Sequence, residues 1–183
     1  AAVRAASREV GPVYLRIGKK GEALVHKELP ELVIGRGIEI RAGEDVCLMS
    51  TGNTLALAVE TAEHFAQEGI SARVVSMHTV KPLDETLVAE AFARHKVVVT
   101  IEEHSRIGGL GGCVAEWLAD QPPQAARLVR IGTPDRFLHE AGEQEHARAL
   151  FGLTPEAIVR ATQKVYRTRP RIVRSAALGC GGR

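Results

Sequence analysis

Three continuous apolar runs separated by helical patterns constrain the fold of this chain more than any other feature. The runs cover residues 45–51, 72–78 and 96–103. Runs of this kind are typical of parallel strands that are buried on both faces of a sheet. Between them, residues 55–68 and 85–94 carry apolar side chains at helical spacing. The alternation predicts right-handed βαβ units in a three-layer α/β/α fold with a mostly parallel sheet of about five strands.

The expected helices carry recognisable boundary signals. Gly69 is placed to cap the carboxyl end of the first helix, because glycine readily adopts the left-handed conformation found there. Asp84 is placed as the amino-terminal cap of the second helix. Thr154 followed by Pro155 marks the start of a later helix that runs to Tyr166.

The segment before the first apolar run reads as the end of one unit that leads into another. Residues 1–10 have a helical pattern, which Gly11-Pro12 ends. Residues 13–17 predict a short strand, and a polar linker follows it. Glycines interrupt residues 32–40, so an irregular strand or hairpin arm is expected there. The chain starts without Met inside a helical pattern, which indicates a fragment, a processed product or an engineered piece.

The last third of the chain continues the alternation and then loses it. Residues 108–120 predict a helix that a glycine-rich turn introduces, and residues 126–132 predict a fourth parallel strand. Residues 143–151 predict a further helix. Residues 167–183 show no periodicity, so we expect a disordered or extended tail.

Composition and cysteine usage exclude several classes of protein. The chain has 183 residues, of which 45% are hydrophobic and 25% charged, as in soluble globular domains. Its net charge of +2 gives no reason to expect nucleic acid or a membrane surface as a partner. No apolar run reaches the roughly 18–20 residues that span a bilayer. Cys47, Cys113 and Cys180 form no CxxC pair, which favours free thiols in a reducing cytoplasm.

Charged side chains and glycines gather at the end of the third run and just after it. Glu102, Glu103 and His104 follow one another there, and a glycine-rich stretch begins at Gly108 and Gly109. Ligands of open α/β sheets bind at the carboxyl edge of the strands. A neighbouring carboxylate could also hold the histidine charged or fix its tautomer. An acid–base site is one interpretation of this cluster, and a packing or subunit-contact role is the favoured one.

Four other candidates carry weaker signals. The turn at residues 50–54 could present backbone N–H groups to an anion, but it lacks the GxGxxG and Walker patterns, which favours an ordinary βα turn. Cys113 would need a lowered thiol pKa to act as a nucleophile. Residues 135–140, DRFLHE, suggest a loop docked on another surface, without metal-ligand spacing. Arg16 and Lys19 could meet a phosphate or a carboxylate.

An ordered set of motifs resembles the C-terminal domain of the transketolase family of thiamine-diphosphate enzymes. In chain order the motifs are GPVYLR, EDVCLMSTG, EGISARVVSMHTVKPLD, VVVTIEEH, GGLGGCVAEWL, RIGTPDRF and FGLTPEAI. The resemblance covers about residues 1–166. It implies that residues 1–19 are the end of a pyrimidine-binding domain, 20–31 a linker, 32–166 the C-terminal domain and 167–183 a tail.

The resemblance implies a function for a larger assembly. Family enzymes use thiamine diphosphate and Mg²⁺ to take a two-carbon ketol unit from a ketose and pass it to an aldose. Their diphosphate and metal ligands lie on an N-terminal domain, and the glutamate that activates the cofactor lies in the body of the pyrimidine-binding domain. Neither region matches this sequence. We therefore expect the chain alone to be inactive, with no catalytic residue, bound cofactor or metal of its own, and to join an N-terminal transketolase polypeptide in a homo- or hetero-oligomer.

One substrate contact carries over through the resemblance. Transketolases place an arginine just after the last strand of the pyrimidine-binding domain, where it holds the substrate phosphate. That position falls on Lys19, and Arg16 matches the arginine three residues earlier. Lysine keeps the charge but loses the bidentate fork. Because lysine replaces the arginine here, three alternatives remain open: a different acceptor sugar, a sugar without the usual phosphate, or no substrate contact at all.

Several branches and classes remain open at this point. Glu103-His104 and GGLGG favour the transketolase branch, particularly the split type made of two chains. A fragment of a deoxyxylulose-phosphate synthase is the alternative, because TVKPLD and TPDRF fit that branch as well. The beta subunits of 2-oxoacid dehydrogenases share the same domain. Outside the family, the chain would be a non-catalytic partner-binding module or, against its motifs, a flavodoxin-like nucleotide-binding domain.

Overall fold

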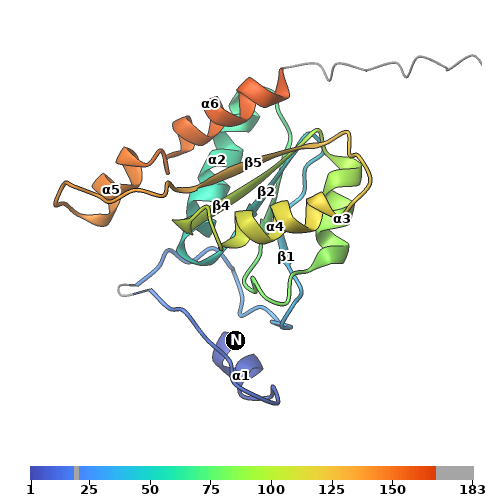
Figure 1. The fold of residues 1–183 in the computed structure, drawn as a ribbon, viewed down its shortest axis with the longest axis vertical. Coiled ribbons are helices and arrows are strands. Elements are labelled where there is room, and N and C mark those ends of the chain that lie inside the picture. Colours follow the sequence, from blue (N-terminus) through green and yellow to red (C-terminus); the bar gives the residue numbers. More distant parts are fainter. Residues whose placement is uncertain (19–20, 168–183) are drawn as a thin grey trace, which may run out of the picture.

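The computed structural model describes residues 1–18 and 21–167 and contains a five-stranded sheet in the order β1-β3-β2-β4-β5 (Figure 1). β1 runs antiparallel to β3, and the other neighbouring pairs are parallel. The expected α/β fold class is therefore confirmed. The strands are β1 (Ile38–Arg41), β2 (Val46–Ser50), β3 (Ala72–Ser76), β4 (Val97–Ser105) and β5 (Arg127–Thr133).

Helices cover both faces of this sheet and make the three layers (Figure 1). α2 and α6 pack together on one face, and α3 and α4 lie on the other. The helices are α1 (Ala2–Ala6), α2 (Leu55–Gln67), α3 (Glu85–Arg94), α4 (Leu110–Ala119), α5 (Gln144–Leu150) and α6 (Pro155–Tyr166), with a short 3-10 turn, η1 (Gly52–Thr54), before α2.

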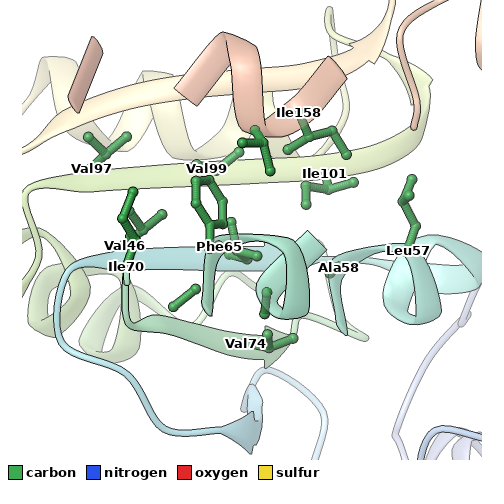
Figure 2. Close-up of a cluster of buried hydrophobic side chains, with 14 of the residues drawn as sticks. Val46, Leu57, Ala58, Phe65, Ile70, Val74, Val97, Val99, Ile101 and Ile158 are labelled. Carbon is green, nitrogen blue, oxygen red and sulfur yellow. The ribbon is translucent and has the colours of Figure 1, made fainter. Parts of the chain in front are cut away.

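The alternation of side chains along the buried strands creates two separate cores. On β2, Val46 and Leu48 face the α2–α6 layer, where Phe65 and Ile158 are fully buried with them (Figure 2). Successive side chains of a strand point to opposite faces, so a sheet covered on both sides needs apolar residues at every position. All five residues of β2 and all five of β3 are buried, which explains why their sequences are continuous runs.

The second core lies between the sheet and the α3–α4 layer. Met49 of β2 and Val98 of β4 pack there against Phe92 of α3 and Val114 of α4. The ring of Phe92 also lies 5.8 Å from that of Trp117, centroid to centroid. Burying a large apolar side chain contributes about 1.5–3 kcal/mol, so these two cores fix the sheet and thereby the positions of the loops at its edges.

The structure confirms the expected caps. The Asp84 carboxylate accepts hydrogen bonds from the backbone N–H groups of Leu87, at 3.1 Å, and Gly37, at 2.9 Å. It therefore caps α3 and also holds the segment that leads into β1. The hydroxyl oxygen of Thr154 accepts from the N–H of Ala157 at 3.3 Å at the start of α6. Gly69 has a φ of 74°, the left-handed conformation expected just after α2.

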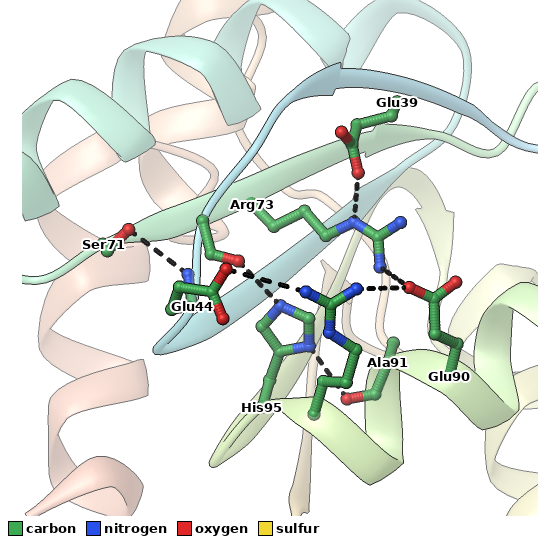
Figure 3. A network of polar contacts seen from close by, with 9 residues as sticks. Glu39, Glu44, Ser71, Arg73, Glu90, Ala91 and His95 are labelled. Atoms are coloured by element: carbon green, nitrogen blue, oxygen red, sulfur yellow. Dashed lines mark hydrogen bonds and ion pairs between the residues drawn. The ribbon is translucent and has the colours of Figure 1, made fainter.

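A charged network joins the antiparallel edge strand to the α3 layer (Figure 3). The Arg73 guanidinium, on β3, donates to the Glu39 carboxylate of β1 at 2.6 Å and to that of Glu90 on α3 at 3.3 Å. The buried ring of His95 places its two nitrogens 3.0 and 3.1 Å from the carbonyl oxygens of Ala91 and Gly43. These polar groups hold β1 in place at the sheet edge.

Two expectations about the first residues are wrong. Residues 13–17 form no strand, and the initial helix covers only Ala2–Ala6. The side chains of residues 13–17 are exposed, and the segment pairs with no strand of the described sheet. A lone strand leaves its backbone groups unpaired, and a strand-like pattern without neighbours therefore remains irregular. Lys19, Cys180 and nearly all of the expected tail, from residue 168 on, lie outside the described residues.

Candidate functional site at the carboxyl edge of the sheet

The connections after β2 and β4 diverge at the carboxyl edge of the sheet. The chain leaves β2 toward α2 on one face and leaves the neighbouring β4 toward α4 on the other. Such a topological switch point is where open α/β sheets bind ligands. The candidate residues Glu102, Glu103 and His104 lie on β4 at this edge, and η1 follows β2 beside them.

The Glu102 carboxylate supports the start of α4. Its side chain is 1% exposed, and its two oxygens accept from the backbone N–H groups of Leu110 and Gly111, each at 2.8 Å. The approach requires glycine, because a Cβ on Gly109 would lie 2.0 Å from a Glu102 oxygen. The positive end of the α4 helix dipole also stabilises a negative charge at this position. Glu102 is thus occupied inside the chain and presents no free oxygen to a ligand.

Glu103 holds α5 against the sheet edge. Its carboxylate accepts from the amide nitrogen of Gln144, at 2.7 and 2.9 Å, and from Nε of Arg148 at 3.0 Å. Burial favours the neutral acid, but the hydrogen bonds from Gln144, Arg148 and Asn53 and the charge of Arg148 outweigh it and lower the pKa of Glu103. Nothing in the sequence singled out Gln144 or Arg148, which lie more than 40 residues away along the chain.

His104 has a hydrogen-bond partner of its own and is bonded to neither carboxylate. Its ring is exposed, and Nδ1 lies 2.9 Å from the carbonyl oxygen of the next residue, Ser105. No hydrogen bond or ion pair joins His104 to Glu102 or Glu103 in the described chain. Gly108 has a φ of 74° and turns the chain toward α4. The structure therefore gathers the acidic side chains and the glycines around two helix starts, and it forms no carboxylate–histidine pair.

The polar turn after β2 is used internally. The Thr54 hydroxyl donates to the carbonyl oxygens of Thr51, at 2.9 Å, and Ile101, at 3.0 Å, and lies 2.8 Å from the Ser50 hydroxyl. These buried contacts tie η1 to β4. The favoured interpretation of this turn as an ordinary βα connection agrees with that geometry.

The two described cysteines are unsuited to act as nucleophiles. Burial raises the pKa of the Cys47 thiol to about 12. Burial also raises the pKa of Cys113, and the nearby carboxylates of Glu116 and Glu102 add to the effect. A nucleophilic cysteine needs the opposite shift, toward the thiolate.

The remaining candidates lie at the periphery. Phe137, in the DRFLHE segment, is 86% exposed. Arg16 is exposed, and its guanidinium donates to the backbone oxygen of Glu103 at 3.4 Å. This contact brings the segment before the domain to the same sheet edge as the Glu102–His104 cluster.

Comparison with known proteins identifies the domain. The family model described as "Transketolase, C-terminal domain" matches residues 35–158. The chain belongs to the transketolase C-terminal domain family. In this transketolase C-terminal domain, the matched region runs from just before β1 into α6.

Two curated proteins illustrate its relatives. Over 155 residues the transketolase C-terminal domain chain is 39% identical to a 6-deoxy-6-sulfo-D-fructose transketolase subunit of Clostridium sp. (strain MSTE9), covering 85% of this chain and 47% of that protein. It is 37% identical over 155 residues to 1-deoxy-D-xylulose-5-phosphate synthase 1 of Geobacter sulfurreducens (strain ATCC 51573 / DSM 12127 / PCA), covering 84% of this chain and 24% of that protein. The chain thus spans about half, or less, of the length of these relatives.

One solved structure is similar to this chain in both fold and sequence. The structure described as "Split gene transketolase, inactive beta4 tetramer" superposes with a TM-score of 0.84 at 38% identity, covering 91% of this chain and 54% of that one. The transketolase of Campylobacter jejuni, at 18% identity and a TM-score of 0.52, shares the fold.

The potential metal ligands in the described part of this transketolase C-terminal domain are scattered. Among residues 1–18 and 21–167, no three or more His, Cys, Asp or Glu side chains gather as metal ligands. The buried carboxylate of Glu102, which could have held a cation, accepts backbone N–H groups instead. No helix in the same residues is long and apolar enough to cross a membrane.

Proposed function

We propose that this chain is the C-terminal part or subunit of a thiamine-diphosphate-dependent transketolase that transfers a two-carbon ketol unit between sugars. The observation that carries the proposal is the likeness to the split-gene transketolase structure, with a TM-score of 0.84 and 38% identity over 91% of this chain. The likeness extends beyond residues 35–158 of the domain match, and the sulfofructose transketolase subunit also covers 85% of the chain.

In this proposal the cofactor and Mg²⁺ bind outside the described residues, on a partner polypeptide that carries the diphosphate-binding domain. The chain supplies assembly contacts. Residues 1–19, the linker at 20–31 and the domain at 32–166 keep the roles that the resemblance implies. Exposed apolar side chains before the domain support an assembly role, because Tyr14 is 88% exposed and Leu24 98%. Large apolar side chains left in water at this density mark a surface that another polypeptide covers.

Arg16 and Lys19 are proposed to reach the anionic end of the sugar. The described position of Arg16, against the Glu103 backbone at the carboxyl edge of the sheet, is consistent with this role. The names of the relatives suggest different anions, because one acts on a sulfo-sugar and another makes a sugar phosphate.

Reconstitution tests the proposed function. The chain is mixed with an N-terminal transketolase polypeptide, thiamine diphosphate and Mg²⁺, and each component is omitted in turn. We expect ketol transfer between sugars in the complete mixture and none from the chain alone. Formation of 1-deoxyxylulose 5-phosphate would instead support the synthase branch, and decarboxylation of a 2-oxoacid the dehydrogenase branch. Stable association without any turnover would favour a non-catalytic partner-binding module.

A further inference from the structure

Three arginines line a pocket at β5, next to the candidate site and made of different residues. The pocket has a volume of about 250 Å³, and Arg106, Arg130 and Arg136 line it together with Gly132 and Phe151. β5 is an edge strand, and α5 and α6 close the other side of the pocket. A pocket of this size holds a small molecule and is too small for most drug-sized ligands.

The three guanidinium groups lack acidic partners. Each of these arginines is exposed, and none of them forms an ion pair within the described chain, whereas Arg73, Arg94 and Arg148 all pair with carboxylates. Arginine stays protonated at any pH at which the protein is folded. The pocket therefore concentrates three positive charges that repel one another, and a multiply charged anion would relieve that repulsion.

The surrounding structure positions the side chain of Arg130 and the backbone of Arg106. Nη1 of Arg130 donates to the backbone oxygen of Arg106 at 3.3 Å, and the N–H of Arg106 donates to the carbonyl oxygen of Thr133 at 3.1 Å. Gly132 leaves room for Arg106, because a Cβ there would lie 3.1 Å from Cγ of Arg106 and 2.9 Å from the backbone oxygen of His104. Arg130 is thus tied to the backbone of Arg106, and the glycine at position 132 lets that backbone and side chain lie close to β5.

An aromatic wall completes the pocket. The guanidinium carbon of Arg136 lies 5.6 Å from the centre of the Phe151 ring, a cation–π contact that orients the third charge. Ala157 and Ala161 of α6 add small apolar side chains to the lining. The site therefore joins a cationic side to an apolar one, which fits a charged head group on a compact organic body better than it fits a bare ion.

We propose that this pocket binds a small phosphomonoester, with its phosphate held by Arg106, Arg130 and Arg136 and its organic part against Phe151. Guanidinium forks match the oxygen geometry of phosphate in pairs of parallel hydrogen bonds. A phosphate dianion also offsets more of the triple positive charge than a single carboxylate does. The inference concerns a site separate from the residues invoked in the proposed function, and it stands or falls independently of transketolase activity.

Calorimetric titration of the full chain tests the proposal, with glycerol 3-phosphate as the probe and glycerol and inorganic phosphate as references. We expect saturable binding of glycerol 3-phosphate, weaker binding of inorganic phosphate and none of glycerol. Arg130→Gln and Arg106→Gln should each weaken binding about tenfold or more, since each removes hydrogen bonds to a charged group. Arg130→Lys, which keeps the charge and loses the fork, should fall between Arg130→Gln and the unaltered chain.

Arg127→Gln is the matched control. Arg127 begins the same strand, is exposed and does not line the pocket, so the change removes the same charge without touching the site. Equal weakening by Arg127→Gln would overturn the proposal in favour of diffuse attraction between charges. Absence of saturable binding at about 10 mM glycerol 3-phosphate would overturn it outright. Equal affinity for inorganic phosphate would overturn the phosphomonoester assignment.

Discussion

At the scale of single residues, two adjacent glutamates have different structural roles. Glu102 is buried and caps α4 through two backbone N–H groups, while Glu103 is partly exposed and binds the side chains of α5. Because the two side chains point to opposite faces of β4, neighbouring positions in the sequence serve different layers. The pair therefore behaves as two independent anchors.

Removal of the Glu102 carboxylate should destabilise the fold strongly. In Glu102→Ala the N–H groups of Leu110 and Gly111 lose their acceptors in a buried site, at about 1–3 kcal/mol each, and a cavity remains. We expect the free energy of unfolding to fall by about 2–5 kcal/mol, measured by urea denaturation. Glu116→Ala, an exposed glutamate on α4, should change it by less than about 0.5 kcal/mol. Similar losses in the two variants would contradict the capping role.

The lowered pKa of Glu103 predicts a dependence of stability on pH. The folded state favours the carboxylate, so the unfolded state binds more protons once the pH falls toward 4.5, the ordinary value for this group. This contribution to stability is full above that value and is lost as the pH falls through the lowered pKa. Arg148→Gln removes a charged partner of Glu103. The unfolding free energy of this variant should therefore change less between about pH 6 and about pH 3 than that of the unaltered chain.

Arg127→Gln serves as the control for this comparison as well, because Arg127 forms no ion pair with a carboxylate in the described chain. Its loss should leave the dependence of the unfolding free energy on pH parallel to that of the unaltered protein. Denaturation midpoints measured across the acid range provide the comparison. An Arg148→Gln profile that runs parallel to the unaltered one would show that Arg148 does not hold the Glu103 carboxylate in its charged form.

At the scale of the elements, the two capping residues differ in what they connect. Asp84 is 7% exposed and bonds both the start of α3 and the segment before β1, through Leu87 and Gly37. Thr154 caps α6 alone, through Ala157. Asp84→Ala should therefore cost about 2–4 kcal/mol, as two bonds to a charged acceptor are lost, and Thr154→Ala about 1 kcal/mol. Thermal unfolding of both variants measures the difference, and equal costs would mean that the bond to Gly37 contributes nothing.

At the scale of the whole molecule, the domain is well packed and the segment before it is not. Val10, Ile17 and Leu24 are each more than 75% exposed, whereas the two cores contain side chains with no exposed surface; Figure 2 shows the first of these cores. An extended segment with bare apolar side chains is the part of the molecule that an assembly has most reason to bury.

Hydrogen exchange should reveal this division. In the isolated chain we expect the backbone amides of residues 1–31 to exchange fast and those of β2 and β4 to exchange slowly, since exchange follows local opening. Addition of the proposed partner polypeptide should slow exchange in residues 1–31 and leave β2 and β4 as they were. Unchanged exchange in residues 1–31 within a formed complex would contradict an assembly role for this segment.

Much of the fold was predictable, because local patterns specify it. The helix at 85–94 matches α3 at both ends, and the start signals at Asp84 and Thr154 match caps that form hydrogen bonds in the structure. The expected strand at residues 13–17 was wrong because a strand depends on neighbours, and a local pattern carries no information about whether a neighbour is present. The order of the motifs indicated the transketolase family, and the family model that matches residues 35–158 supports that assignment.

The candidate site was predictable as a place and not as a set of contacts. By itself, the sequence determined that Glu102 and Glu103 end a central strand, since apolar periodicity and chain order depend on neighbours within a few residues. The tertiary structure decided that Glu102 caps α4 and that Arg148, 45 residues further on, binds Glu103. It also brought Arg106, Arg130 and Arg136 around one pocket. Contacts of that kind depend on how separate elements pack, and packing distances are not encoded in any local pattern of residues.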